Sequence, residues 1–354
     1  MERFLDAKLR ALAAYTPGEQ PRDMGKLIKL NTNESPFPPS PKALAAAEAA
    51  ARELRLYPDP ACAALHAAIA RRFGLAPEQV CTGNGSDELL GLLFHGFCPR
   101  GAAFPDISYG FYPVFAEMFS VKWTEVPLRE DFSVAVEDYA SQPGTVFLAN
   151  PNAPTGLCLP LSDIRRLLEQ NPARLVVVDE AYVDFGGESA ASLLGEYANL
   201  CVVQTFSKSR QLAGGRLGFA LGRAALIRDL TTLKFSFNPY SVNRVALAAG
   251  TAAMEDEAYF EACRQKIMES RAWAAGALRA LGCTVLPSKA NFLFVSAPGL
   301  PGGDYYAALR RRQILVRWFD KPRIRDYVRI TVGTREEMEA LVRATGEILK
   351  GGNL

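Results

Sequence analysis

Two stretches of the chain decide the fold: Arg174-Leu-Val-Val-Val-Asp179-Glu-Ala-Tyr182 and, further along, Thr205-Phe206-Ser207-Lys208-Ser209. The first is a short apolar, β-branched run that ends abruptly in Asp-Glu. Such a run is typical of a buried parallel strand that presents a carboxylate at its C-terminal end. The second stretch follows another apolar run, 200–203, and leads into Ala213-Gly-Gly-Arg216. The chain therefore carries, in this order, a strand-end aspartate, a lysine between hydroxyl residues, and an arginine.

This ordered set is what pyridoxal phosphate (PLP) chemistry requires. A lysine forms the Schiff base with the cofactor, an aspartate keeps the pyridine nitrogen protonated, and hydroxyls with an arginine bind the phosphate. Each residue alone is weak evidence for such a site, because most lysines are solvated surface charges and most aspartates at strand ends cap helices or lie in turns. Taken together, Asp179, Lys208 and Arg216 predict a PLP site, in which Lys208 also moves protons at the substrate carbon.

Composition narrows the function classes. With 354 residues, 49% of them apolar, the chain is long enough for one large domain and a smaller one. Forty basic against 38 acidic residues leave +2, which favours neither nucleic acid nor a membrane surface. Seven cysteines without a CxxC pair and only two histidines support neither a metal site nor a Ser-His-Asp nucleophile. The N-terminus lacks the apolar core of a signal peptide, so we expect a soluble cytoplasmic protein.

Strands and helices alternate after Gly74, which indicates an α/β fold with a mostly parallel sheet covered on both faces. The expected strands are 79–82, 101–106, 121–126, 145–149, 175–178, 200–203 and 217–220, and the expected helices include 41–54, 61–73 and 88–97. A long helix over 259–281 begins a smaller α+β domain with strands at 291–295, 314–316 and 328–331 and a last helix over 335–349. We expect an N-terminal arm over 1–40, a large domain over 41–256 and a small domain over 257–354.

Three further motifs follow expected strands. Gly83-Asn-Gly85-Ser86-Asp87 offers free backbone N–H groups at a helix start, which suit a phosphate, although a serine-capped helix after a tight turn fits the same residues. The ring of Tyr109 could stack on a flat cofactor or be an ordinary half-buried tyrosine. Asn150-Pro-Asn152-Ala-Pro-Thr-Gly156 offers amides to a phenolic oxygen, but is also a common turn signal.

With these motifs in place, the chain resembles the histidinol-phosphate aminotransferase family of the fold-type I PLP-dependent aminotransferases of class II. The segments that carry the resemblance run in family order over nearly the whole chain. They are Ala14–Gln20, Ile28–Glu34, Tyr57–Asp59, Gly83–Asp87, Tyr109–Tyr112, Asn150–Gly156, Val178–Tyr182, Ser207–Ser209, Ala213–Arg216, Leu315–Arg317 and Val328–Thr334.

The resemblance implies that Lys208 holds PLP, that Asp179 pairs with its ring nitrogen, and that Tyr182 reaches its phenolic oxygen. The other residues that it implies for the cofactor are Gly85, Ser86, Asp87, Tyr109, Asn152, Thr205, Ser207, Arg216 and, from a neighbouring subunit, Tyr57. Those that it implies for the substrate are Tyr15, Asn33, Arg317 and Arg329. The active site would then be shared within a homodimer.

The chain departs from the family pattern in two places. The asparagine that usually precedes Pro-Thr-Gly is Ala153, so Asn152 is expected to supply that hydrogen bond instead. The run Ser209-Arg210-Gln211 after the lysine is also less usual than a stretch of small or aromatic residues.

As function, the resemblance implies transamination between L-histidinol phosphate and 2-oxoglutarate in histidine biosynthesis. Three alternatives stay open at this point. One is a broad aromatic amino-acid aminotransferase, and another is a PLP lyase or decarboxylase such as threonine-phosphate decarboxylase. The third is a PLP-fold regulator, which is disfavoured because the chain has no basic helix-turn-helix segment.

Overall fold

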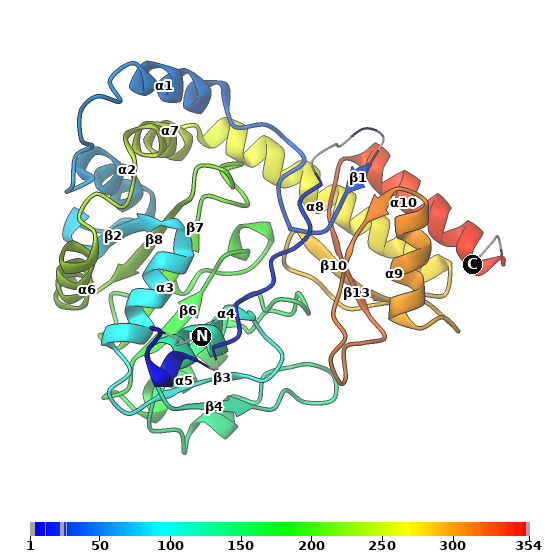
Figure 1. The fold of residues 1–354 in the computed structure, drawn as a ribbon, viewed down its shortest axis with the longest axis horizontal. Helices are drawn as coiled ribbons and strands as arrows, with labels where there is room; N and C mark the ends of the chain where they lie inside the picture. Colours follow the sequence, from blue (N-terminus) through cyan, green and yellow to red (C-terminus); the bar gives the residue numbers. More distant parts are fainter. Residues whose placement is uncertain (1–3, 11, 22–24, 26, 352–354) are drawn as a thin grey trace.

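The computed structural model of the protein describes residues 4–10, 12–21, 25 and 27–351, and its large domain is built on a seven-stranded sheet (Figure 1). The strand order is β2-β8-β7-β6-β5-β3-β4. The strands are β2 (Val80–Asn84), β3 (Ala102–Pro105), β4 (Trp123–Val126), β5 (Thr145–Ala149), β6 (Val176–Asp179), β7 (Leu200–Thr205) and β8 (Leu217–Gly222). Only β8 runs antiparallel to its neighbours. The expected α/β fold with a mostly parallel mixed sheet is confirmed.

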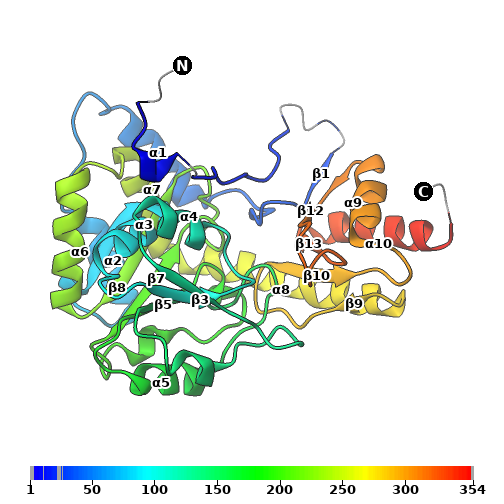
Figure 2. The ribbon, with the colours of Figure 1, turned by 60° about the horizontal axis from the view of Figure 1, so that its bottom comes forward.

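Helices cover both faces of this sheet (Figure 2). They are α1 (Pro41–Ala51), α2 (Ala63–Phe73), α3 (Gly85–Gly96), α4 (Phe111–Met118), α5 (Leu161–Gln170), α6 (Ala224–Phe237) and α7 (Arg244–Glu255), with 3-10 turns η2 (Pro77–Gln79), η3 (Val136–Tyr139), η4 (Val183–Phe185) and η5 (Ala190–Leu193). Residues of α2, α5 and α7 pack on one face, and residues of α3, α4 and α6 pack on the other.

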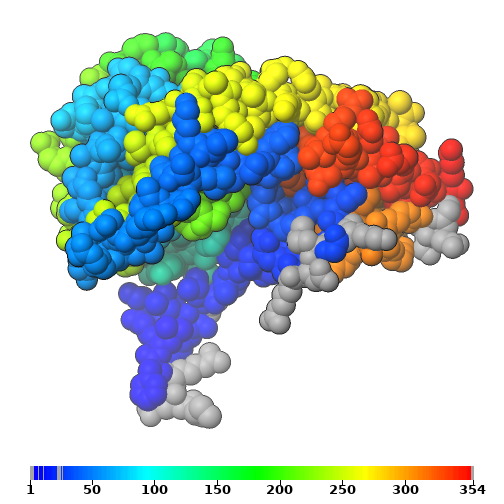
Figure 3. Space-filling model, turned by 90° about the horizontal axis from the view of Figure 1, so that it is seen from above, coloured from blue at the N-terminus to red at the C-terminus, as the bar shows by residue number. Residues whose placement is uncertain are grey.

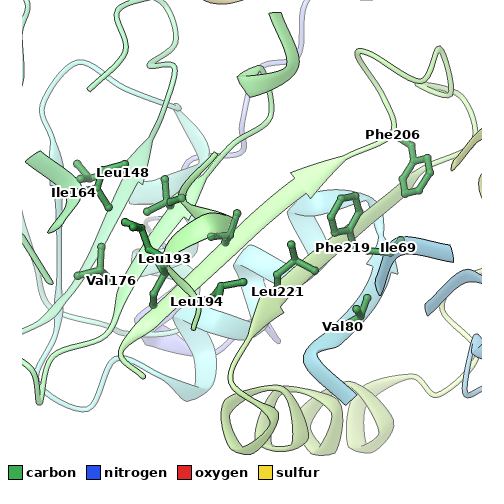
Figure 4. Close-up of a cluster of buried hydrophobic side chains, with 14 of the residues drawn as sticks. Ile69, Val80, Leu148, Ile164, Val176, Leu193, Leu194, Phe206, Phe219 and Leu221 are labelled. Carbon is green, nitrogen blue, oxygen red and sulfur yellow. The ribbon is translucent and has the colours of Figure 1, made fainter. Parts of the chain in front are cut away.

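The central strands explain why the sheet forms where it does. Val176 and Val178 enter the core on one face of β6, and Val177 enters the core on the other. All three are fully buried, and burial of a valine side chain contributes about 1.5–3 kcal/mol. Figure 4 shows Val176 beside Leu148 of β5 in the first of these cores. A continuous β-branched run is therefore stable only between two helical layers.

The small domain is an antiparallel sheet with three helices. Its strand order is β12-β13-β10-β9. Its elements are α8 (Glu257–Ala280), β9 (Thr284–Val285), β10 (Phe292–Ser296), α9 (Gly302–Arg311), β12 (Arg317–Trp318), β13 (Val328–Thr331) and α10 (Arg335–Leu349). The long helix α8 reaches from the large domain into the small one (Figure 1). This smaller α+β part agrees with the expected fold class.

The N-terminal segment joins the two domains. It holds a 3-10 turn, η1 (Ala7–Leu9), and a short strand, β1 (Ile28–Lys29), which pairs in parallel with β11 (Ile314–Leu315). Leu30 follows β1 and is buried in the core of the small domain. Figure 3 shows the first described residues projecting from the body and the later ones lying against the small domain. The arm predicted over 1–40 includes residues 1–3, 11, 22–24 and 26, which lie outside the described residues.

The domain boundaries after residues 40 and 256 stay predictions. Helix α7 ends at Glu255 and α8 begins at Glu257, so the second boundary coincides with a break between two helices. Within the described part of the chain, no helix is long and apolar enough to cross a membrane.

Candidate active site

A cavity of about 430 Å³ lies at the C-terminal ends of β5, β6 and β7. In open α/β sheets, ligands bind at the carboxyl ends of the strands. The predicted residues that line this cavity are Ser86, Asp87, Tyr109, Asp179, Tyr182, Thr205, Ser207, Lys208 and Arg216. These residues come from five separate segments of the chain, and the sheet brings them together.

Lys208 follows the end of β7 and projects into the cavity. Its Nζ donates a hydrogen bond to the carbonyl oxygen of Thr32 at 3.3 Å and lies 5.9 Å from the centre of the Tyr182 ring. Burial, together with the positive charge of Arg329, lowers the pKa of Lys208 to about 8. A buried amine with this pKa is neutral for much of the time near pH 8, which a nucleophile and general base requires.

Asp179 ends β6 and is held by Tyr112 of α4. The Tyr112 hydroxyl donates to Oδ2 of Asp179 at 2.9 Å, and the backbone N–H of Ala181 donates to Oδ1 at 3.3 Å. Burial raises the pKa of Asp179 to about 6, although the hydrogen bond from Tyr112 opposes that shift. Above this pH the cavity wall carries a fixed negative charge, which favours a protonated nitrogen beside it.

The start of α3 forms the part of the wall suited to a phosphate. Gly85 begins the helix with a φ of 76°, a left-handed conformation that glycine adopts without strain. A Cβ atom on Gly85 would lie 2.8 Å from the Arg216 guanidinium, and one on Gly218 would collide with the backbone nitrogen of Ser86. The alternative of a serine cap is wrong, because the helix begins at Gly85 and Ser86 lies in its first turn. The side chain at the N-cap, Asn84, makes no capping hydrogen bond, so this helix start with its dipole suits an anion.

Asp87 links three parts of this wall. It accepts a hydrogen bond from the Tyr109 hydroxyl at 2.7 Å and pairs with Arg216 at 3.2 Å. Burial and the adjacent Asp87 charge raise the pKa of Tyr109, so its hydroxyl stays protonated. Across the cavity, the hydroxyl of Thr205 donates to Ser207 at 2.9 Å. The ring of Tyr109 and the hydroxyl pair are thereby held in fixed positions.

Asn152 is not brought to the cavity. Its amide donates to the carbonyl oxygen of Ile107 at 2.9 Å and to the hydroxyl of Thr155 at 3.1 Å, and its oxygen accepts from Ser108. It lines a separate cavity next to Tyr327, while Ala153 lines the cavity with Lys208. The structure therefore does not place Asn152 where it could supply the missing hydrogen bond, because its amide is bonded to Thr155 of its own loop and to Ile107 and Ser108 after β3.

The predicted substrate arginines lie on neighbouring strands of the small domain. Arg317 and Arg329 are directly opposite each other in the β12–β13 pair. Burial lowers the pKa of Arg329, and the charge of Arg317 lowers it further. Among the described residues, nothing accepts a hydrogen bond from the buried Nε of Arg329. Two guanidinium groups placed in this way repel each other unless an anion lies between them.

The arm supplies a lid of aromatic and carbonyl groups beside these arginines. Arg317 donates to the carbonyl oxygens of Thr16 at 3.2 Å and Pro17 at 3.5 Å. Tyr15 stacks on Phe111 of α4 with 4.1 Å between ring centres. Tyr15 therefore packs the arm against the large domain, close enough to act on the pKa of Arg329, and its contact with the substrate stays a prediction.

Seven of the predicted residues are not part of the cavity lining: Gly85, Asn152, Tyr15, Arg317, Arg329, Asn33 and Tyr57. The side chain of Asn33 is buried behind Tyr182 and donates to its hydroxyl at 2.9 Å. Tyr57 is 78% exposed and stacks on Tyr240 at the surface, with 4.7 Å between ring centres. In one copy of the chain, Tyr57 contributes nothing to this cavity.

Sequence reasoning missed several residues at the site. Tyr112 was given no role, although it lies in the first turn of α4, three residues after Tyr109, and the centres of the two rings are 5.6 Å apart. Gln20, Thr32 and Glu34 of the N-terminal segment also line the cavity, and their positions depend on a strand pairing that local patterns do not reveal.

The unusual Arg210 has a structural explanation. Its guanidinium lies 3.7 Å from the centre of the Phe260 ring and donates to the carbonyl oxygen of Ala253 at 2.9 Å. It therefore fastens the end of α7 and the start of α8 to the loop that carries Lys208.

The residues present fit PLP on chemical grounds. A buried lysine with a lowered pKa suits its aldehyde, a strand-end carboxylate suits its ring nitrogen, and a glycine-rich helix start beside Arg216 suits its phosphate. The fold and this cavity define a fold-type I PLP-dependent aminotransferase. More particularly, the chain belongs to the histidinol-phosphate aminotransferase family, within the family described as aminotransferase class I and II, whose match covers residues 25–344.

Known relatives span the whole chain. Histidinol-phosphate aminotransferase 2 of Rhizobium meliloti (strain 1021) is 52% identical over 352 residues, covering 99% of this chain and all of the relative. A histidinol-phosphate aminotransferase of Acinetobacter baylyi is 50% identical over 346 residues, with 96% of each chain covered. The crystal structure of a histidinol-phosphate aminotransferase from Sinorhizobium meliloti in complex with pyridoxal-5'-phosphate has a TM-score of 0.83 and 26% identity, covering 92% of this chain and 91% of that one.

Proposed function

We propose that this protein transfers the amino group of L-histidinol phosphate to 2-oxoglutarate in histidine biosynthesis. Relatives of that name align with about the full length of the chain at 50% identity or more. The observation that carries the proposal within the structure is the pair Arg317 and Arg329, whose adjacent positive charges suit a dianionic group.

Lys208, Asp179 and Arg216 have separate roles in the proposed reaction. Bound PLP supplies the aldehyde that takes up the amino group and a ring that accepts electrons from the substrate carbon. Lys208 removes the proton from the carbon that bears the amino group and returns a proton to complete the exchange. Asp179 keeps a negative charge beside the ring nitrogen, and the start of α3 with Arg216 holds the phosphate in place.

The same arrangement explains how the substrate is oriented. Arg329 and Arg317 bind the anionic group on the small-domain side, next to the cavity, and Tyr15 of the arm covers it. The amino group then lies toward Lys208, and the imidazole ring lies among Tyr109, Tyr15 and Phe111. A ring pocket of this kind also admits phenylalanine, so a broad aromatic aminotransferase is the second candidate function.

A steady-state comparison of amino donors tests the proposal. The purified protein, loaded with PLP, is assayed with 2-oxoglutarate and either L-histidinol phosphate or L-phenylalanine. We expect kcat/KM to be at least about 100-fold higher for histidinol phosphate, because a dianion gains about 1.5–3 kcal/mol per charged hydrogen bond. Equal values would favour the broad aromatic aminotransferase, and carbon dioxide release would favour a decarboxylase.

We further propose that the working form is a cytoplasmic homodimer with shared active sites. The surface around Tyr57 supports it, because large apolar side chains are exposed there in a single copy. These are Leu54, Leu56, Tyr57, Phe237 and Tyr240, with exposed fractions of 42% to 78%. Exposed apolar clusters of this kind mark protein interfaces, and a second copy of the chain would cover them and use Tyr57 at its own cofactor phosphate.

Complementation between two inactive variants tests the shared site. Lys208→Ala and Tyr57→Phe homodimers are mixed, and subunit exchange is followed by mass spectrometry. Mixed dimers should contain one unimpaired site and gain activity over both parents. Exchange without any gain in activity would contradict sharing, and a monomer in analytical ultracentrifugation would contradict the dimer itself.

A further inference from the structure

Asn33 stands out because its side chain is buried behind the cavity and both ends of its amide make hydrogen bonds. The residue is 1% exposed and adopts a left-handed backbone with a φ of 56°. Its Nδ2 donates to the hydroxyl oxygen of Tyr182 at 2.9 Å, and its Oδ1 accepts from the hydroxyl of Thr331 at 3.1 Å. Its carbonyl oxygen accepts from the amide of Asn291 at 3.0 Å.

Thr331 also bonds to Asn33. The backbone N–H of Asn33 donates to Oγ1 of Thr331 at 2.9 Å. The Thr331 hydroxyl in turn donates its hydrogen to Oδ1 of the Asn33 amide. With Oδ1 bonded to Thr331, the amide nitrogen faces the hydroxyl of Tyr182.

The orientation of Asn33 sets the role of the Tyr182 hydroxyl. The phenolic oxygen accepts from Asn33, so the phenolic hydrogen is free to be donated elsewhere, and Tyr182 lines the cavity. Burial raises the pKa of Tyr182, while Arg329 and the hydrogen bond from Asn33 lower it. Asn33 therefore makes the tyrosine a stronger donor, since hydrogen bonds in a chain polarise one another.

The Tyr182 hydroxyl is more important in this chain because Ala153 replaces the asparagine that is usual in the family. An asparagine at that position would bring a second donor to the cavity, but Ala153 has none and the Asn152 amide donates to Ile107 and Thr155 instead. Tyr182 is then the side-chain donor available to the phenolic oxygen of PLP on this wall.

We propose that Asn33 is a positioning residue that directs and strengthens the hydrogen bond from Tyr182 to the phenolic oxygen of PLP. This role differs from the direct substrate contact predicted from the sequence. It rests on the assignment of the cofactor and not on the identity of the amino donor, so the two proposals fail separately.

Substitution of Asn33 by glycine tests the role. Glycine accepts a φ of 56° without strain and keeps both backbone hydrogen bonds, so only the side chain is lost. The readout is the pH midpoint of the visible absorption change of the protein loaded with PLP. A donor to the phenolic oxygen favours its ionised form, so a weaker donor should raise this midpoint in Asn33→Gly, by about half a pH unit.

If Asn33 acts through Tyr182, the effects of substituting the two residues on the pH midpoint should not add. Tyr182→Phe should raise the midpoint by about one pH unit, and Asn33→Gly should add almost nothing in that background. Thr331→Val removes the hydroxyl that orients the amide, touches neither Tyr182 nor the cavity lining, and should raise the midpoint in the wild-type background. Asn31→Ala removes another buried amide of the same segment, one that bonds to Glu19, and should leave the midpoint unchanged.

Three results would overturn the proposal. One is an unchanged midpoint in Asn33→Gly or, if that variant does not fold, in Thr331→Val. Another is a shift that persists undiminished in the Tyr182→Phe background, which would mean that Asn33 acts without the tyrosine. The third is the absence of a visible band in the loaded wild-type protein, which would remove the cofactor assignment and this proposal with it.

Discussion

The two ends of the site, which are the cavity wall on the large domain and the arginine pair on the small domain, differ in how far their charged groups are already paired. At the large-domain end, Asp179 is bonded to Tyr112 at 2.9 Å, and Asp87 is bonded to both Tyr109 and Arg216. At the small-domain end, Arg317 donates to two backbone carbonyls of the arm and Arg329 donates to the carbonyl oxygen of Asn31, while the buried Nε of Arg329 has no partner among the described residues. The first end is preorganised for a resident group. The second has unsatisfied positive charge, which a substrate anion can complete.

The largest effect should come from the lysine of the preorganised end. Lys208→Ala should lower kcat by at least about 10⁴-fold, because the covalent and the proton-transfer roles vanish together. Stopped-flow or long-incubation assays of the PLP-loaded variant measure the loss. Lys289→Ala changes a lysine outside the cavity lining and serves as the control. Appreciable turnover in Lys208→Ala would mean that another residue moves the proton.

Asp179→Asn should have the next largest effect at the same end. We expect kcat to fall by about 10²–10³-fold with the fold intact, because a neutral amide no longer favours a protonated ring nitrogen. Circular dichroism establishes the fold, and steady-state kinetics establish the loss. Activity close to that of the wild type would remove Asp179 from the mechanism.

At the unsatisfied end, Arg317→Ala should reduce kcat/KM for histidinol phosphate by at least tenfold, or about 1.4 kcal/mol. The loss for phenylalanine should be smaller, because its single carboxylate charge benefits less from two guanidinium groups. Arg325→Ala is the matched control, since Arg325 lies on the same domain and pairs with Asp320 at the surface. Equal losses for both substrates would show that the arginine pair does not distinguish a phosphate.

The smallest effect concerns the rate at which the apoprotein takes up PLP. The pKa of Lys208 is lowered to about 8 by burial. A protonated amine is not a nucleophile, so the rate should rise with pH, by about fivefold from pH 7 to pH 8, and then level off. Absorbance during rapid mixing measures it. A rate that still climbs steeply above pH 9 would place the lysine in a more exposed site than the structure has.

The sequence predicted the fold best where local signals are sharp. The expected strands 145–149 and 328–331 and the helix 335–349 match β5, β13 and α10 to the residue. Thr334 and Glu337 form a capping box at the start of α10, which is a signal contained in four residues. Expected ends elsewhere differ by one to three residues, as with α1, which ends at Ala51 rather than Leu54.

The site was harder to predict where contacts join distant segments. Lys208, Asp179 and Arg216 could be found because each follows or precedes a recognisable strand. Tyr112 and the Asn33–Tyr182 bond could not, because they depend on how α4 and the N-terminal segment pack against β6 and its following loop. Asn152 was predicted for the cavity because chain position does not reveal which way an amide points.

Trapping the cofactor on its lysine tests the central claim most directly. The protein loaded with PLP is reduced with borohydride and digested, and the peptides are mapped by mass spectrometry. The structure predicts that the visible absorption is lost and that the mass of the reduced cofactor is found on the peptide that contains Lys208. The same mass on a peptide with any other lysine, and none on Lys208, would contradict the account.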